Sequence, residues 1–419
     1  MVTDRGSGVG DRNLAVSLSR PRDPQTIWLV VALLVAAAGL RLWRVDQPPA
    51  QYFDEIYYAR TAQEYLTGAP IYEWTHPPLS KLLIAAGVRV FGLTPRGWRV
   101  APALFGVLLI AALYLLGCWV FDNPRKGVLL AFVGTIEPFF LVESRIAKPE
   151  IFLVGFAVAA YAFWWAALRS GRLRWLYLAG LCAGGAAATK WTGAATTAVL
   201  VFATILAWRR GAMRVRPGHA AAALLLLPLV VYAASYAPHL ARGETLGDVL
   251  RLHRNMYGYH STLQATHPYT SAWWTWPLLL RPMWYHYEAT GGTMTGVFAV
   301  GNPLLWWAAI PAIALVAWRG WTHRRLEDVF VAAGFGLTYL PYAVIGRLLF
   351  VYHMLPALPF AYLALLSLAD AAAARTGLRW VTAYLVVAAL VFVYYLPVLT
   401  AYPVPAHWLR WWIWIRSWV

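Results

Sequence analysis

Acidic residues are scarce in this 419-residue chain, and charges of either sign are few. Asp and Glu number 18 against 35 Lys and Arg, and charged residues make up 13% of the chain while apolar ones make up 60%. With a mean hydropathy of +0.55, this composition excludes a soluble domain and indicates a polytopic membrane protein. The basic residues collect in short loops between apolar segments, so we expect a lipid bilayer and no nucleic acid as partner.

Cysteine is almost absent as well. Cys118 and Cys182 lie in apolar segments and lack the spacing of metal ligands, so we expect neither a disulfide nor a cysteine metal site. The polar stretch 1–25 has no small-residue cleavage site after a short apolar core, which predicts a cytoplasmic tail before an uncleaved helix. No internal repeat is visible.

About eleven apolar segments approach the length that spans a bilayer. They cover residues 27–42, 98–120, 128–142, 151–168, 176–188, 193–208, 219–236, 303–318, 329–345, 351–368 and 380–400. Segment 79–91 is shorter and carries Lys81 and Arg89, so we expect an interfacial helix there. The prediction is an all-α polytopic protein with a tail over 1–25, a transmembrane domain over 26–400 and a Trp-rich extracytoplasmic tail over 401–419.

The basic loops orient the predicted bundle. If the N-terminus is cytoplasmic, the short Arg-rich loops alternate onto the cytoplasmic side. The other side receives two long loops, about 43–97 and 237–302, and the ionisable residues at several helix ends. Every candidate chemical group therefore falls on the extracytoplasmic face, where ionisable residues are functional candidates by default.

Two adjacent acids in the first long loop, Asp54 and Glu55, are the leading catalytic candidates. Neighbours on a helix point about 100° apart, so both cannot face one substrate atom. We expect one of the two acids to act chemically and the other to orient it or to bind a cation. The alternative is an interfacial N-cap or a salt bridge to Arg44 or Arg60.

A rigid turn into the next helix follows at His76-Pro77-Pro78. Lys81 then lies one turn into the helix, near the positive end of its dipole, which favours an anion such as phosphate. The alternative for Lys81 is snorkelling to lipid headgroups, and a hydrogen-bonding role is expected for His76.

Cationic side chains at helix ends share this face. They are Arg99, Arg145, Lys148, Lys190 and Arg347. Each could anchor a helix end, but their convergence with acids suits a pocket for a charged lipid headgroup. The loop 253–288 is rich in His, Tyr, Trp and Arg, which suits sugar and peptide contact as well as it suits a loop lying in the interface.

In these motifs the chain resembles the protein O-mannosyltransferases, polytopic glycosyltransferases that use lipid-phosphate sugars. The resembling elements are Asp54-Glu55, His76 to Lys81, Arg99 to Gly106, Lys190-Trp191-Thr192-Gly193, His267 to Ser271, Trp276-Pro277, Arg281 to Tyr285, Gly301-Asn302-Pro303 and Arg347 to Ala357. Ser80 stands where the family usually has Gly. Lys148-Pro149-Glu150 stands where it has Asp in a slightly different frame, so the role of Glu150 stays open.

The resemblance implies the GT-C fold and inverting transfer of mannose from a polyprenyl-phosphate donor to Ser or Thr of an acceptor polypeptide, at the extracytoplasmic face of the plasma membrane. Such chemistry needs one base and several cations at the departing phosphate. We expect Asp54 to be that base, with Glu55 as its support in the catalytic pair. Arg99, Lys190 and Arg347 are expected to bind that phosphate, with Lys81 and Arg145 as weaker candidates. The residues expected to shape the substrate site are His76, Glu150, His267, Tyr352 and His353.

Three points stay open at this level. No metal ligands are predicted, although a divalent cation is compatible with the inventory. A related transferase could use a lipid or polysaccharide acceptor instead of a polypeptide. A transporter or flippase is the other class, although its ionisable groups tend to lie near the bilayer midplane on inverted repeats.

Overall fold

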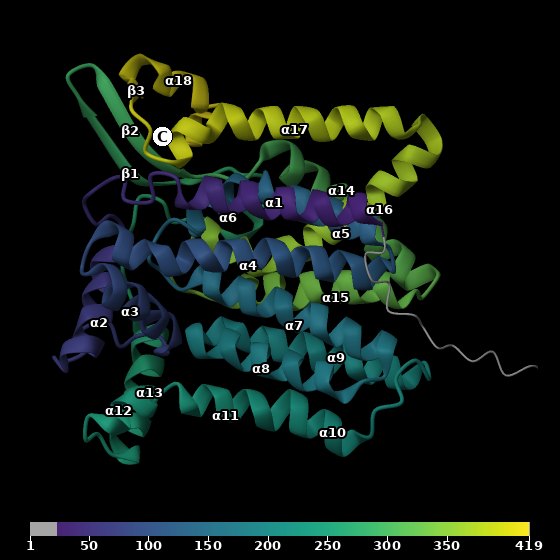
Figure 1. Ribbon diagram of the computed structural model, residues 1–419, viewed down its shortest axis with the longest axis horizontal. Helices are drawn as coiled ribbons and strands as arrows, with labels where there is room; N and C mark the ends of the chain where they lie inside the picture. Colours follow the sequence, from purple (N-terminus) through teal and green to yellow (C-terminus); the bar gives the residue numbers. More distant parts are fainter. Residues whose placement is uncertain (1–22, 419) are drawn as a thin grey trace, which may run out of the picture.

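The computed structural model describes residues 23–418, so the predicted tail over 1–25 lies almost entirely outside it. The described chain is a bundle of long helices with roughly parallel axes (Figure 1). Eight of its helical segments are long and apolar enough to cross a membrane. A helical polytopic architecture is thereby confirmed, while the count of about eleven spans stays a prediction.

All eleven predicted apolar segments are helical. The eight long ones are α1 (Pro24–Leu42), α4 (Pro95–Phe121), α7 (Glu150–Ser170), η1 (Trp191–Gly193) with α9 (Ala194–Arg209), α10 (Pro217–Ala221) running through η2 (Ala222–Leu226), α11 (Leu227–Ala234) and α12 (Ala237–Ala241), α14 (Pro303–Thr322), η5 (Val351–Ala357) with α16 (Leu358–Thr376), and α17 (Leu378–Leu399). The three shorter ones are α5 (Pro124–Thr135) with α6 (Pro138–Glu143), α8 (Leu173–Thr189), and α15 (Leu326–Tyr339) with η4 (Leu340–Val344).

Several of these helices begin at the same local signal. Asp23, Thr94, Asn123 and Asn302 each cap a helix through a side-chain oxygen, and proline occupies the first turn that follows. The cap satisfies an otherwise unpaired N–H, and proline has no N–H to lose there. These short polar-proline steps fix where the helices start at each membrane face.

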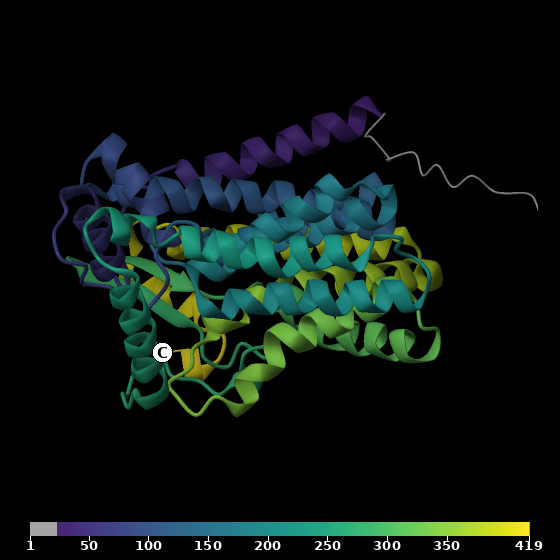
Figure 2. The ribbon, with the colours of Figure 1, turned by 90° about the horizontal axis from the view of Figure 1, so that it is seen from below.

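Burial decreases from the centre of the bundle to its edge. Of the apolar window in α7, 78% is buried, against 17% in α1 and 22% in α17. Figure 2 shows α1 along one edge, set apart from most of the other helices. The exposed apolar faces of α1 and α17 are therefore the ones left to lipid.

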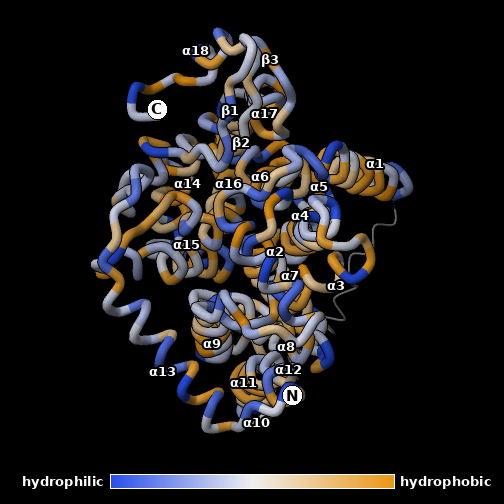
Figure 3. The backbone as a smooth tube through the Cα atoms, turned by 90° about the vertical axis from the view of Figure 1, so that its left-hand side faces the viewer, coloured by the Kyte–Doolittle hydropathy of each residue, from blue (hydrophilic) through white to orange (hydrophobic). Residues whose placement is uncertain are grey.

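The polar elements gather at one end of the bundle. They are α2 (Glu55–Thr67), α3 (Leu79–Phe91), α13 (Leu246–Thr262), η3 (Trp273–Thr275), η6 (Ala406–Trp408), α18 (Leu409–Trp412), η7 (Arg416–Trp418) and the strands. The bounds of α3 coincide with the predicted interfacial helix. Seen end-on in Figure 3, the spans are largely orange, whereas α13 alternates between hydrophobic and hydrophilic residues.

A small antiparallel sheet at this end was not predicted. Its order is β1 (Met283–Thr290), β2 (Thr293–Ala299) and β3 (Val404–Pro405). Gly291 and Gly292 connect β1 to β2 with φ values of 59° and 79°. Positive φ at both positions is what a two-residue type I′ hairpin requires. Strands β1 and β2 belong to the second long loop, about 237–302, and β3 belongs to the predicted C-terminal tail, so the sheet connects these two parts of the chain.

Candidate functional site

The segment Tyr52-Phe53-Asp54-Glu55 is held by three of its four side chains. The Tyr52 hydroxyl donates to the Arg145 carbonyl at 3.2 Å, and the Phe53 ring stacks on Tyr285 with centroids 4.5 Å apart. Phe53 has a φ of 50°, a conformation that bulky residues rarely adopt. The strained turn and its anchors leave the Asp54 carboxylate to face the cluster of charges beyond it.

Asp54 is not used for the structural roles that were its alternatives. It occupies the N-cap of α2, but its side chain makes no capping hydrogen bond. Arg60 pairs with Glu64 at 2.8 Å instead, and the Arg44 guanidinium lies over the Tyr402 ring at 5.5 Å. Within residues 23–418, no hydrogen bond or ion pair to the Asp54 carboxylate is found, although the residue is partly buried.

Burial and nearby charges bring the pKa of this carboxyl group close to neutral pH. Burial raises the pKa of Asp54 to about 6, while the nearby charges of Lys148 and Lys190 lower it and those of Glu150 and Glu73 raise it. A carboxyl group with a pKa near 6 is ionised at pH 7 and yet basic enough to accept a proton from a hydroxyl.

Glu55 points away from Asp54 into a closed ion pair with Arg99. Arg99 donates to both Glu55 oxygens, at 2.8 and 2.7 Å, and both side chains are 0% exposed. The remaining donors of Arg99 bind the carbonyls of Val45, Pro48 and Ala50. The geometry contradicts the expected role of Arg99, which has no donor left for a phosphate, whereas Glu55 holds the loop that carries Asp54, as a supporting residue would.

Lys148, which the sequence placed among the cations of this face without a role of its own, lies at the centre of the cluster. Its ammonium is fully buried, donates to the Tyr285 hydroxyl at 2.8 Å and pairs with Glu143 at 3.1 Å. It also lies over the rings of Tyr352 at 4.0 Å and Phe53 at 5.5 Å. Lys148 therefore ties the turn before Asp54 to β1 and η5, and cation–π contacts of this kind gain strength when desolvated.

Glu150, whose role the sequence left open, bridges two lysines. Its carboxylate accepts from Lys190 at 2.8 Å and lies 3.6 Å from Lys148. Glu150 begins α7 and is paired on both sides, which explains why an acid is needed at this helix start: the positive end of the dipole and two ammonium groups meet there.

A cavity of about 340 Å³ opens beside this cluster. It is lined by Thr75, His76, Pro77, Lys190, Trp191, Thr192, Tyr257, His260, Ser261, Tyr342, Ile345, Arg347, Leu349 and His353. A smaller pocket shares Lys190, Thr192, Tyr342 and His353 with it and reaches Glu150 and Tyr352. The cavity volume falls in the range of about 300–1,000 Å³ that holds small ligands.

Two of the predicted phosphate-binding cations line that cavity, Lys190 and Arg347. Arg347 donates to Nδ1 of His260, whose Nε2 lies 2.7 Å from the Thr75 carbonyl and donates to it. Burial, followed by the charges of His76 and Arg347, lowers the pKa of His260 to about 4. A neutral His260 leaves the positive charge of Arg347 uncompensated, so this guanidinium is available to an anion.

The other two candidate cations are used by the protein itself. Lys81 is 1% exposed and donates to a Glu73 carboxylate oxygen at 2.6 Å and to the Glu73 and His76 carbonyls at 2.7 Å each. Arg145 donates to the carbonyls of Leu40, Arg41, Trp43 and Arg44, which closes the C-terminus of α1. Neither side chain lines the cavity, so their expected roles at the phosphate are contradicted by their placement.

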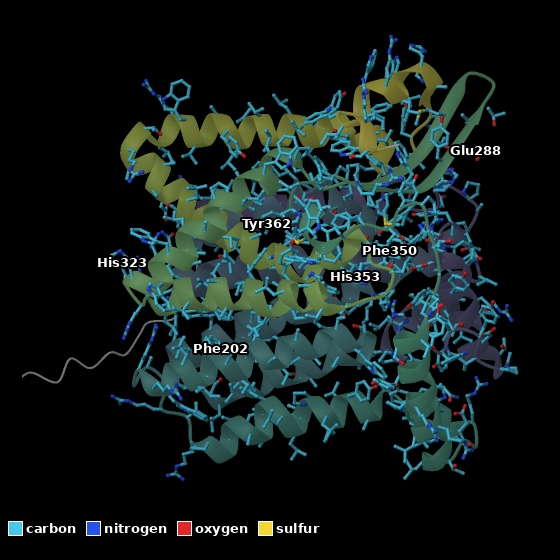
Figure 4. All side chains as sticks on the ribbon, turned by 180° about the vertical axis from the view of Figure 1, so that it is seen from behind. Phe202, Glu288, His323, Phe350, His353 and Tyr362 are labelled. Carbon is cyan, nitrogen blue, oxygen red and sulfur yellow. The ribbon has the colours of Figure 1, made fainter. Side chains whose placement is uncertain are left out.

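The remaining predicted residues divide between the cavity and its supports. His76 lines the cavity, with Nδ1 2.9 Å from the Thr75 hydroxyl. His353 lines both pockets, and Tyr352 stacks against it at 4.6 Å (Figure 4 labels His353 and Phe350). His267 packs its ring on Phe350 at 5.1 Å, behind the cavity wall.

Sequence patterns missed two further residues of the site, Glu143 and Glu73, and gave no individual role to Lys148 and Tyr285. Lys148 stood in a motif that departs from the family, and a basic residue between two acids at a helix junction was the available signal. No group of three or more His, Cys, Asp or Glu side chains suited to a metal ion occurs in the described part of the chain.

Comparison with known proteins gives a consistent picture. The family model described as the C-terminal four-transmembrane region of protein O-mannosyltransferase matches residues 245–418, and two models described as dolichyl-phosphate-mannose-protein mannosyltransferase match residues 31–98 and 75–235. The polyprenol-phosphate-mannose–protein mannosyltransferase of Mycolicibacterium smegmatis is 28% identical over 95% of this chain and 94% of its own.

Solved structures share the fold at low sequence identity. A chain of the Saccharomyces cerevisiae protein O-mannosyltransferase Pmt1–Pmt2 complex bound to the sugar donor matches with a TM-score of 0.84 at 14% identity, covering 97% of this chain and 94% of that one. ArnT from Cupriavidus metallidurans bound to undecaprenyl phosphate matches with a TM-score of 0.58 at 18% identity, over 90% and 74% of the two chains.

Proposed function

Because the chain belongs to the protein O-mannosyltransferase family, we propose that it transfers mannose from polyprenyl-phosphate-mannose to Ser or Thr hydroxyls of polypeptides, with inversion. The observation that carries the proposal is the unpaired Asp54 carboxylate, which interacts electrostatically with Lys190 of the cavity lining, together with the second cation of that lining, Arg347. One base and cations at the departing phosphate are what this transfer requires.

The reaction proceeds in one displacement. The acceptor oxygen forms a bond to the anomeric carbon while the bond from that carbon to the phosphate oxygen breaks. Asp54 takes the hydroxyl proton, and the polyprenyl phosphate leaves with both electrons of the broken bond, its charge balanced by Lys190 and Arg347. A phosphate needs no protonation to depart, so a second acid is unnecessary.

The membrane setting follows from the same placement. We propose that the end of the bundle carrying α2, α13 and β1 faces the extracytoplasmic side of the plasma membrane, where acceptor polypeptides emerge. The short loops at the other end hold Arg209, Arg210 and Arg214, which favours a cytoplasmic position for that end. Ionisable groups concentrated at one face also argue against a transporter, whose site would lie near the midplane.

The direct test uses purified protein, polyprenyl-phosphate-mannose and a Thr-rich peptide, with mass spectrometry to detect one added hexose on a Thr side chain. Parallel reactions contain a lipid acceptor in place of the peptide, and EDTA in a third set. Transfer to the lipid but not to the peptide would show that the acceptor is a lipid and not a polypeptide. Movement of the donor across the membrane of proteoliposomes without transfer would favour a flippase.

Arg347→Met is expected to raise the KM for the donor by about tenfold to a hundredfold, because a charge-assisted hydrogen bond contributes about 1.5–3 kcal/mol. The peptide KM should change little. Arg254 is an exposed arginine on α13 outside the cavity lining, and Arg254→Met is the matched control. Equal donor KM values for the two variants would contradict the assignment of Arg347 to the phosphate.

The rate of transfer is expected to fall as the pH drops through about 6, by about tenfold per pH unit below that midpoint, because only ionised Asp54 accepts the proton. Lys148→Met removes a positive charge that lowers the Asp54 pKa, so its midpoint should move to higher pH. Glu150, Lys190 and Glu73, which also influence Asp54, are unchanged in that variant.

The matched control for this pH profile is Lys126→Met, at the start of α5, where the lysine pairs with Asp370 far from the site. A midpoint that stays fixed in Lys148→Met, or that moves equally in both variants, would show that the acidic limb reports another group.

A further inference from the structure

The hairpin at the site end of the molecule has one edge bonded to the protein and one edge open. On the β2 side, the Gly296 carbonyl accepts from Ala401 N–H at 3.1 Å, and Met294 pairs with Val404 of β3. Both residues thus direct their backbone groups away from β1. In an antiparallel ladder, two directly opposed residues either both point their N–H and C=O groups at each other or both point them outward. The residues opposite Gly296 and Met294 are Tyr287 and Ala289, which therefore direct their N–H and C=O groups away from β2.

That outer edge of β1 has no partner in the described chain. The last four residues of the strand, Tyr287 to Thr290, are all exposed. Among residues 23–418, no hydrogen bond reaches the outward N–H and C=O groups of Tyr287 or Ala289. Figure 1 shows the hairpin projecting from the bundle, with β3 beyond β2 on the covered side. Unpaired groups on a strand edge are a template for another extended chain.

The same strand leads directly into the candidate site. Tyr285 stacks on Phe53, the residue before Asp54, and its hydroxyl accepts from Lys148. The His286 ring lies 6.0 Å from that of Tyr52. From Ala289 to Tyr285 is four residues, about 13 Å of extended chain. A polypeptide aligned along Tyr287 and Ala289 would therefore continue toward the Asp54 carboxylate.

We propose that the outer edge of β1 docks an extended segment of the acceptor polypeptide as an added strand, which delivers its Ser or Thr side chain to Asp54. This inference rests on the proposed function. Only a polypeptide matches the feature, since a lipid headgroup or glycan lacks alternating N–H and C=O groups at strand spacing. Recognition through the backbone reads little of the acceptor sequence, which suits an enzyme that modifies many proteins.

The charge of the β1 edge limits which acceptor segments fit it. Glu288 is the single Asp, Glu, Lys or Arg residue in β1 and β2, and it lies between the two docking residues. Neutral or basic segments therefore fit this edge better than acidic ones, whose side chains would face a like charge across the new strand pair.

Ala289→Pro is the first test. Proline removes the outward N–H but leaves the ladder to β2 intact, because the Ala289 N–H takes no part in it. The KM for a 12-residue Thr peptide should rise by about tenfold, the effect of losing one hydrogen bond of about 1.4 kcal/mol. The donor KM and the transfer to N-acetyl-threonine amide, which is too short to pair with β1, should stay unchanged. Ala289→Val keeps the N–H and is the control.

A second test leaves the protein unaltered and so does not depend on folding of a variant. Peptides carrying a single backbone N-methyl group at successive positions on one side of the Thr are compared with wild-type enzyme. Pairing with β1 predicts that KM rises at alternate positions only. A uniform response together with an unchanged KM in Ala289→Pro overturns the docking proposal while leaving the mannosyltransferase proposal standing. Failure to modify both acceptors would instead refute the proposed function itself.

Discussion

Asp54→Asn is expected to lower the rate of mannose transfer by about 10²–10⁴-fold, the contribution of a positioned general base. The amide has the shape of the carboxylate but cannot accept the proton of the acceptor hydroxyl. Asp54 has no hydrogen-bond partner among residues 23–418 that the substitution would break, so folding and the donor KM should be preserved. The measurement is the rate of hexose addition to the Thr peptide at saturating donor.

Asp46→Asn provides the matched control, since Asp46 lies in the same loop and faces Arg96 at 3.7 Å on the surface. Its rate should remain within about twofold of wild type, as expected for an exposed ion pair that contributes little. If Asp54→Asn retained a rate close to that of Asp46→Asn, the base would have to be another group, and Glu150 would be examined next because it lines the small pocket.

The other carboxylates near Asp54 are each committed to a partner. Glu55 pairs with Arg99, Glu143 with Lys148 and Tyr285, and Glu73 with Lys81. A carboxylate with a strong cationic partner is a weaker base, because its charged form is stabilised. For Glu73, burial alone would raise the pKa, but Lys81 and His76 hold it well below its usual range. Asp54 is the acid of this group that combines burial with the lack of a direct partner.

Hydropathy was sufficient to predict the helical bundle, and loop charge was sufficient to predict that the candidate ionisable side chains share one end of it. Span lengths follow from the bilayer and loop charges follow from insertion, so both are properties of local sequence. The bounds of α3 and the separation of Asp54 from Glu55 on α2 are equally local, since they depend on helix periodicity.

The pairing of the cations could not be read from the sequence. Arg99 and Glu55 are 44 positions apart, and Lys190 and Glu150 are 40 apart, so only the fold decides which lysine or arginine is neutralised. The position of Lys81 at a helix start predicts a phosphate ligand, but in the structure its ammonium group is hydrogen-bonded to Glu73. The hairpin was hidden for another reason: β1 alternates poorly, because its first half is buried in the site and its second half is exposed.

The second large effect is expected in stability. Glu55→Gln or Arg99→Met should each lower the free energy of unfolding by about 3–5 kcal/mol, because either change leaves one fully buried charge without its partner. The double variant Glu55→Gln/Arg99→Met should recover most of that loss. Unfolding of the purified protein in mixed micelles measures all three. The surface pair Arg96–Asp46, whose side chains are 60% and 44% exposed, is the control, with an expected loss below about 1 kcal/mol.

The same three variants separate a structural role of Arg99 from the phosphate-binding role that its sequence position predicted. If Arg99 only fixes the loop, the double variant regains transfer along with stability, because Asp54 returns to its place when the loop refolds. If Arg99 also contacted the donor, stability would recover while the donor KM stayed high. The bidentate pair and three backbone carbonyls occupy all donors of the guanidinium, so we expect the first result. The phosphate would then be received in the cavity by Arg347 and by Lys190, which also pairs with Glu150.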